Sequence, residues 1–142
     1  MHPFSLRRLL WAGPLATAAA VLVNLLFFSL TKALGEQYIL PLDGSSTNLG
    51  PMSILMPVVV TLVPGLLATI LFGLLLRFAR SPVIAFLSVC VTALLLSFGG
   101  PFYLPSATLV TKLLLCSMNL IAGVIITAGI LILDLNRTKP LL

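Results

Sequence analysis

The chain has 142 residues, of which 60% are hydrophobic and only 8% are charged. Soluble domains carry roughly 25% charged residues, so this composition excludes an ordinary soluble fold. The formal net charge is +5, but the basic residues form no patch interleaved with aromatic residues, so we expect no nucleic-acid partner. Only helices and closed barrels satisfy their backbone groups within lipid, and the apolar segments are far longer than barrel strands of about 10 residues. We therefore predict an all-α integral membrane four-helix bundle that forms a single domain, residues 1–142.

The first two apolar segments cover about residues 9–30 and 52–76. The first is too long for the 7–15-residue apolar region of a signal peptide, so we interpret it as a membrane span. The second contains Pro57 and Pro64. We expect each proline to remove a backbone hydrogen bond and to bend this helix.

The third and fourth apolar segments cover about residues 83–98 and 109–133. At a rise of 1.5 Å per residue the third is only about 24 Å long, so we expect it to stand near the membrane normal. The fourth is long enough to tilt. With these two segments the chain has four predicted spans.

The basic residues near the ends of the spans predict the orientation, because cytoplasmic loops carry an excess of Lys and Arg. Lys32 and Lys112 fall on one side, and six basic residues fall on the other: Arg7, Arg8, Arg77, Arg80, Arg137 and Lys139. This asymmetry places the N-terminus, the C-terminus and the short second loop in the cytoplasm. Residues 35–50 and 99–105 then form two outer loops.

Four aromatic residues lie near predicted span ends, where amphipathic rings anchor a protein at the interface. They are Trp11, Tyr38, Phe102 and Tyr103. In the first outer loop, residues 43–48 are rich in turn formers, so we expect this segment to be mobile.

Small and polar residues recur on one face of three spans, a pattern typical of helix contacts within lipid. The three stripes are Ala12, Ala16, Ala20 and Asn24; Thr61, Gly65, Thr69 and Gly73; and Lys112, Cys116, Asn119, Gly123 and Thr127. We interpret these stripes as the protein-facing sides. The sequence leaves open whether they meet helices of the same chain or of a second protomer.

Three polar residues within the spans are candidates for a functional site. The amides of Asn24 and Asn119 each need a partner within lipid, either in an interhelical hydrogen bond or in a polar site or ion path. Lys112 lies about one turn inside the fourth span. Its side chain either extends to the interface or binds an anionic headgroup or ligand.

Groups that commonly carry chemistry are missing from the predicted spans. No Asp or Glu falls within them, and the only histidine is His2. Cys90 and Cys116 lie in apolar segments without a C-x-x-C pair. We therefore expect no catalytic residue, no metal site, no cofactor and no enzymatic activity.

Four segments carry a resemblance to a known family: residues 58–62 (Val-Val-Val-Thr-Leu), 77–80 (Arg-Phe-Ala-Arg), 95–101 (Leu-Leu-Ser-Phe-Gly-Gly-Pro) and 112–122 (Lys-Leu-Leu-Leu-Cys-Ser-Met-Asn-Leu-Ile-Ala). With Asn24, they make nearly the whole chain resemble an uncharacterised bacterial family of four-helix membrane proteins, domain of unknown function 6069. The resemblance implies a bacterial plasma-membrane location and no known activity. In that family the position of Asn119 often carries His, so a histidine-based role is not expected here.

Three functions follow from these features. The leading hypothesis is a non-enzymatic membrane interaction or accessory protein that contacts a second copy or another membrane protein through Asn24, Asn119 and the glycine stripe of the second span. The alternative is a small-solute or ion permeation unit that acts as an oligomer, with the same asparagines lining the path. A third is lipid binding through Lys112 and residues 99–105.

Overall fold

The computed structural model describes residues 6–41, 48–104 and 107–135. Its described elements are α1 (Leu6–Ala33), β1 (Ile39–Pro41), β2 (Leu49–Pro51), α2 (Leu55–Phe78), α3 (Pro82–Phe102) and α4 (Leu109–Leu135). All four of these helices are long and apolar enough to cross a membrane. The predicted all-α four-helix bundle is confirmed, and the chain is a multi-pass membrane protein.

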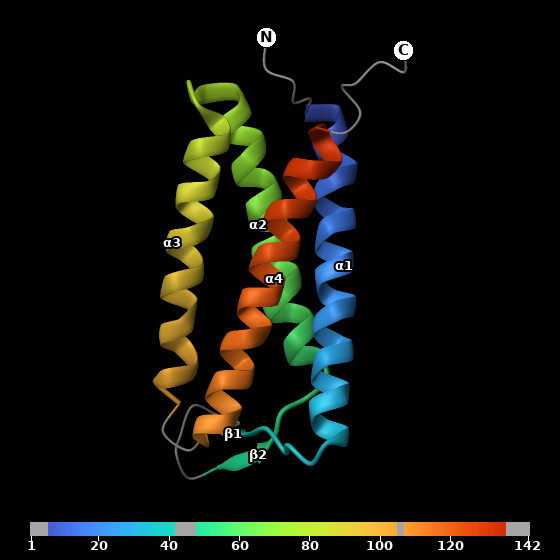
Figure 1. Cartoon of the computed structure of the whole chain (residues 1–142), viewed down its shortest axis with the longest axis vertical. Helices are drawn as coiled ribbons and strands as arrows, with labels where there is room; N and C mark the ends of the chain where they lie inside the picture. The colour runs from blue at the N-terminus through green and yellow to red at the C-terminus, as the bar shows by residue number, and fades with distance from the viewer. Residues whose placement is uncertain (1–5, 42–47, 105–106, 136–142) are drawn as a thin grey trace.

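The bundle has two different ends (Figure 1). One end holds the start of α1, the α2–α3 turn and the end of α4; we call it the arginine end, because it carries Arg7, Arg8, Arg77 and Arg80. The opposite, hairpin end holds Lys32, Lys112 and the antiparallel pair of β1 and β2, in which Leu40 lies opposite Gly50. The basic asymmetry of the sequence is thus an asymmetry between the two ends, although Arg137 and Lys139 lie outside the described residues.

Two helices differ from the predicted segments in ways that involve proline. α3 continues to Phe102, so its 21 residues span about 30 Å, and residues 99–102 are helical where a loop was expected. α2 begins at Leu55, which places Pro57 in the first turn, where a backbone N–H has no acceptor within the helix. The expectation that Pro57 removes a hydrogen bond is therefore wrong, and only Pro64 lies inside α2.

α1 is the helix around which the bundle is arranged, since it packs along both α2 and α4. Its buried residues form two adjacent rows: Leu9, Ala12, Gly13, Ala16, Thr17, Ala20, Asn24 and Phe28. The row that contains Gly13 and Thr17 faces α2. Ala16 faces α4, where a Cβ added at Gly129 would lie 2.6 Å from the Ala16 Cβ. Small side chains thus let α1 approach two neighbours closely.

α1 and α2 approach through two reciprocal contacts between glycine and threonine. A Cβ added at Gly65 would lie 2.5 Å from Thr17 Cγ2, and one added at Gly13 would lie closer still to Thr69. The Thr17 and Thr69 hydroxyls donate to the carbonyl oxygens of Gly13 and Gly65 at 2.8 and 2.9 Å. Each threonine therefore satisfies its hydroxyl within its own helix and fills the space that the opposing glycine leaves open.

These contacts come from a short repeat that the sequence analysis missed. Residues 13–17 read Gly-Pro-Leu-Ala-Thr and residues 65–69 read Gly-Leu-Leu-Ala-Thr. Because the helices run antiparallel, the glycine of each copy meets the threonine of the other. A five-residue segment repeated on two antiparallel helices thus sets their distance.

α3 is the least buried of the four helices. Its fully buried residues, Pro82, Phe86 and Pro101, lie near its two ends. Near the arginine end, the Phe86 ring packs on the Phe72 ring of α2 with centroids 4.7 Å apart. The middle of α3 has no fully buried residue, which leaves it the most weakly attached helix of the bundle.

We predict that Gly65→Ala lowers the free energy of unfolding by about 1–3 kcal/mol, because the new methyl group overlaps Thr17. Thr17→Ala removes the two closest atoms, so the double variant should regain part of this loss. Gly100→Ala is the matched control, since it also replaces a helical glycine but meets no atom within 4 Å. Unfolding by sodium dodecyl sulfate in mixed micelles, followed by circular dichroism, measures the free energy of unfolding of the wild type, Gly65→Ala, the double variant and Gly100→Ala. Equal stability of Gly65→Ala and Gly100→Ala would contradict the prediction.

Candidate functional site

Asn24 ties three helices together near the hairpin half of the bundle. The residue is 2% exposed. Its Nδ2 atom donates to Thr61 Oγ1 of α2 at 2.9 Å and to the Met118 carbonyl oxygen of α4 at 3.2 Å. Its Oδ1 atom is buried without a hydrogen-bond partner among the described residues. The amide therefore acts here as an interhelical bond of α1, α2 and α4.

Asn119 follows Met118 directly but faces a different neighbour. Its Nδ2 atom donates to the Ser97 carbonyl oxygen of α3 at 3.3 Å. Pro101 lies four residues after Ser97 and has no N–H, so this carbonyl lacks the usual donor four residues on. Asn119 supplies that donor from α4. Asn24 and Asn119 thus bond separate helices and do not form one shared polar site.

The small-residue stripe of α2 faces α1 within the same chain. Thr61 bonds Asn24, while Gly65 and Thr69 form the reciprocal contacts with α1. A Cβ added at Gly73 would lie 3.3 Å from Leu9 Cδ2. The structure therefore answers the question that the sequence left open, because this stripe packs intramolecularly.

The stripe of α4 forms a seam with α3. Lys112 Nζ donates to the Phe102 carbonyl oxygen at 3.5 Å, and Cys116 Sγ to the Phe98 carbonyl oxygen at 4.0 Å. Further along, Gly123 faces Leu94, and Thr127 lies near the Cys90 thiol. The polar contacts are long, so they hold α3 beside α4 without burying much of it. Lys112 bonds the last carbonyl of α3 at the hairpin end.

Tyr38 closes the hairpin end from beneath α1. It is 1% exposed, so the expectation that it anchors the protein at the interface is wrong. Its hydroxyl is hydrogen bonded to Thr31 Oγ1 at 2.6 Å, and its ring packs on Phe28 with centroids 4.9 Å apart. Its backbone has a φ of +47°, uncommon outside glycine, and its carbonyl accepts a bond from the Met52 N–H. No local sequence pattern marks this tyrosine as buried.

Glu36 joins the same end of the bundle to α4. Its carboxylate accepts a hydrogen bond from the buried Thr111 hydroxyl, which also pairs with Thr108 Oγ1 at 2.9 Å. The Lys32 ammonium lies 5.7 Å from the centroid of the Phe28 ring. The chain between α1 and β1 is therefore folded onto the bundle. Residues 42–47, which hold most of the segment predicted to be mobile, lie outside the described residues.

Potential metal ligands do not gather in the part of the chain that the structure describes, where no group of three or more His, Cys, Asp or Glu residues occurs. Cys90 and Cys116 are both free thiols.

A comparison with protein families identifies the chain. The model described as Family of unknown function (DUF6069) matches residues 4–133. The chain belongs to this family. The resemblance seen in the sequence is thereby confirmed, and it assigns no activity. No curated protein and no solved structure matches the chain.

We predict that Asn24→Leu lowers the free energy of unfolding by about 1–2 kcal/mol, because it removes two interhelical bonds from a buried position. Asn119→Leu is the matched control, since it removes one longer bond from a half-buried position and should cost about 0.6 kcal/mol. Unfolding in mixed micelles compares the two variants with the wild type. A larger loss of free energy of unfolding for Asn119→Leu would contradict the prediction that the bonds of Asn24 stabilise the bundle more than the bond of Asn119.

We predict that Tyr38 ionises above its ordinary pKa of 10.0. Burial raises the pKa of this phenol, the bond with Thr31 lowers it and the charge of Glu36 raises it again. Because the pKa is raised in the folded state, the stabilising contribution of the neutral phenol is fully present below pH 10 and is lost as the pH rises through the folded pKa. Ultraviolet titration of the Tyr103→Phe variant isolates Tyr38, the other of the two tyrosines. A midpoint at or below 10 would contradict the buried placement.

Proposed function

We propose that this protein is a non-enzymatic membrane interaction protein that associates with a transmembrane helix of a second copy or of another membrane protein through α3. The observation that carries the proposal is the exposure of α3, which has no fully buried residue between its two ends. Figure 1 shows α3 at the edge of the bundle, beside α4 and α2. α1, by contrast, packs along both α2 and α4.

Most exposed side chains of α3 are large and apolar, such as Ile84 and Leu96, but a small polar pair lies among them. Ser88, Thr92 and Ala93 are all exposed, and Ser88 and Thr92 lie one turn apart on one side of the helix. Small residues let two helices approach closely within lipid. The Thr92 hydroxyl donates to the Ser88 carbonyl oxygen at 2.8 Å. The Thr92 hydroxyl is therefore satisfied within α3 and needs no bond from a partner helix.

The contact residues of this proposal differ from those of the sequence hypothesis. The glycine stripe of α2 and Asn24 are used inside the bundle, and Asn119 is used against α3. A partner helix therefore has access to the outer face of α3 and not to the residues first considered. The same hydrogen bonds support a structural rather than a catalytic role for the intramembrane polar groups.

We further propose a bacterial plasma-membrane location with the arginine end in the cytoplasm. Arg7, Arg8, Arg77 and Arg80 lie at that end, against Lys32 and Lys112 at the hairpin end, and cytoplasmic ends carry the excess of basic residues. The family resemblance supports the bacterial location.

The permeation alternative receives less support from the geometry. That hypothesis uses Asn24 and Asn119 to line one path, but the two amides bond different helices. It predicts ion or solute flux in proteoliposomes that Asn119→Leu diminishes.

We predict that Ser88→Leu/Thr92→Leu reduces association about tenfold, because two bulky side chains separate the helices that would otherwise meet. Each variant is extracted from its membrane in nanodiscs, and native mass spectrometry then measures the number of protomers in the complex and any other protein bound to it. Ala18→Leu/Ala19→Leu, which enlarges two small exposed residues of α1, is the matched control and should leave association unchanged. A wild-type chain that is monomeric and free of other proteins, or an equal loss in both variants, would contradict the proposal.

A further inference from the structure

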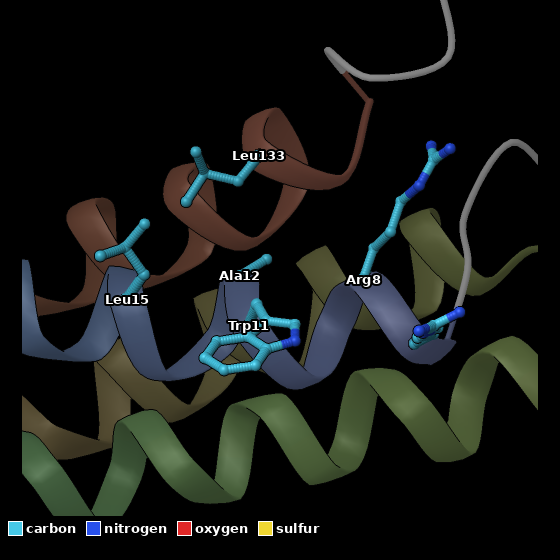
Figure 2. A pocket seen from close by; sticks show the side chains of 6 residues that line it. Arg8, Trp11, Ala12, Leu15 and Leu133 are labelled. Atoms are coloured by element: carbon cyan, nitrogen blue, oxygen red, sulfur yellow. The ribbon is translucent and has the colours of Figure 1, made fainter.

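A pocket of about 470 Å³ opens at the arginine end between α1 and α4. Its walls are formed by Arg7, Arg8, Trp11, Ala12, Leu15 and Leu133. Figure 2 shows Leu133 on α4 above Ala12 and Leu15 on α1, with Arg8 extending from α1 on the side of α4. Arg8, Ala12 and Leu15 follow one another at helical spacing, so they share one side of α1. The pocket is therefore basic at the end of the bundle and apolar further into the span.

The positive charge at this pocket is not balanced by a described acidic side chain. Glu36 is the only acidic residue whose side chain the structure describes, and it lies at the hairpin end, bonded to Thr111. Within the first turn of α1, Arg7 and Arg8 have no acidic neighbour. Two guanidinium groups at one end of the pocket are complementary to a ligand of negative charge, while Asp134, the acidic residue that follows Leu133, has a side chain outside the described part of the structure.

The depth of the pocket points to a lipid. Trp11 is 80% exposed, and amphipathic rings of this kind lie at the level of the headgroups. The two arginines then lie at phosphate level, where a guanidinium binds phosphate oxygens in a bidentate manner. Leu15 and Leu133 lie deeper, along the path of an acyl chain.

We propose that this pocket binds an anionic glycerophospholipid, with its phosphate at Arg7 and Arg8 and an acyl chain against Leu15 and Leu133. Basic pockets between transmembrane helices bind acidic headgroups in this way. A free phosphate compound would use the arginines alone and leave the apolar walls unused. The site lies on α1 and α4, so it goes beyond the proposed role of α3 and does not depend on it.

Trp11 is the only tryptophan of the chain, so its fluorescence reports on this pocket. The purified protein is reconstituted in phosphatidylcholine nanodiscs that contain increasing fractions of phosphatidylglycerol brominated on its acyl chains, which quenches tryptophan on contact. We expect more quenching than with brominated phosphatidylcholine at the same fraction. We expect Arg7→Gln/Arg8→Gln to reduce this preference about fivefold or more, since each arginine near an anionic lipid contributes about this factor.

Arg77→Gln/Arg80→Gln is the matched control. It removes the same charge from the same end of the bundle, but neither residue lines the pocket, so the preference should persist. Circular dichroism verifies that each variant is folded, and the single variant Arg8→Gln replaces the double variant if the latter does not fold.

Four results would overturn the proposal. The first is equal quenching by the two brominated lipids, and the second is an equal loss of preference in the variants of both arginine pairs. The third is reversal of the quenching by millimolar glycerol phosphate, which would identify a soluble anion as the ligand. The fourth concerns Asp134, which follows Leu133 in the chain. A preference that appears only after Asp134→Asn would show that the native pocket does not take an acidic lipid.

Discussion

Two reciprocal contacts between glycine and threonine bring α1 and α2 so close that no other side chain fits at Gly13 or Gly65 without a shift of its neighbour. Within lipid the hydrophobic effect does not draw helices together, so close van der Waals packing must stabilise their association. The threonine hydroxyls do not oppose this packing, because they are bonded to their own helices. Thr61 lies one turn from Gly65, and the close approach places it within reach of Asn24. The distance between two helices thus decides the bonding of a buried amide.

α4 packs firmly on the pair of α1 and α2, and α3 is attached more weakly. α4 meets α1 at Ala16 and Gly129, and again through the bond from Asn24 to the Met118 carbonyl oxygen. α3 is attached by long polar contacts with α4 and by packed residues near its two ends. A helix attached in this way presents most of its surface to its surroundings. This hierarchy is the physical basis for assigning the partner surface to α3.

The two ends of the bundle treat their polar groups differently. At the hairpin end, Tyr38 and Glu36 bond Thr31 and Thr111, so the chain that leaves α1 is folded back onto the helices. At the arginine end, Arg7 and Arg8 line a pocket together with Trp11 and apolar side chains. A pocket of about 420 Å³ also lies at the hairpin end, but both Lys32 and Glu36 line it, whereas the charged residues that line the pocket at the arginine end are both basic. The lipid site and the α3 surface are therefore independent features of one scaffold.

Composition and periodicity determined the class of protein, the number of spans, the basic asymmetry and the protein-facing sides of α1 and α2, because hydropathy and helical spacing are properties of neighbouring residues along the chain. The burial of Asn24 and Thr61 follows from this local pattern. Only the tertiary structure decided that Tyr38 is buried, that Asn119 bonds the carbonyl whose usual donor Pro101 lacks, and that the α2 stripe meets α1. These outcomes depend on the distance and rotation between helices, which contacts between residues remote in sequence determine and no local pattern records.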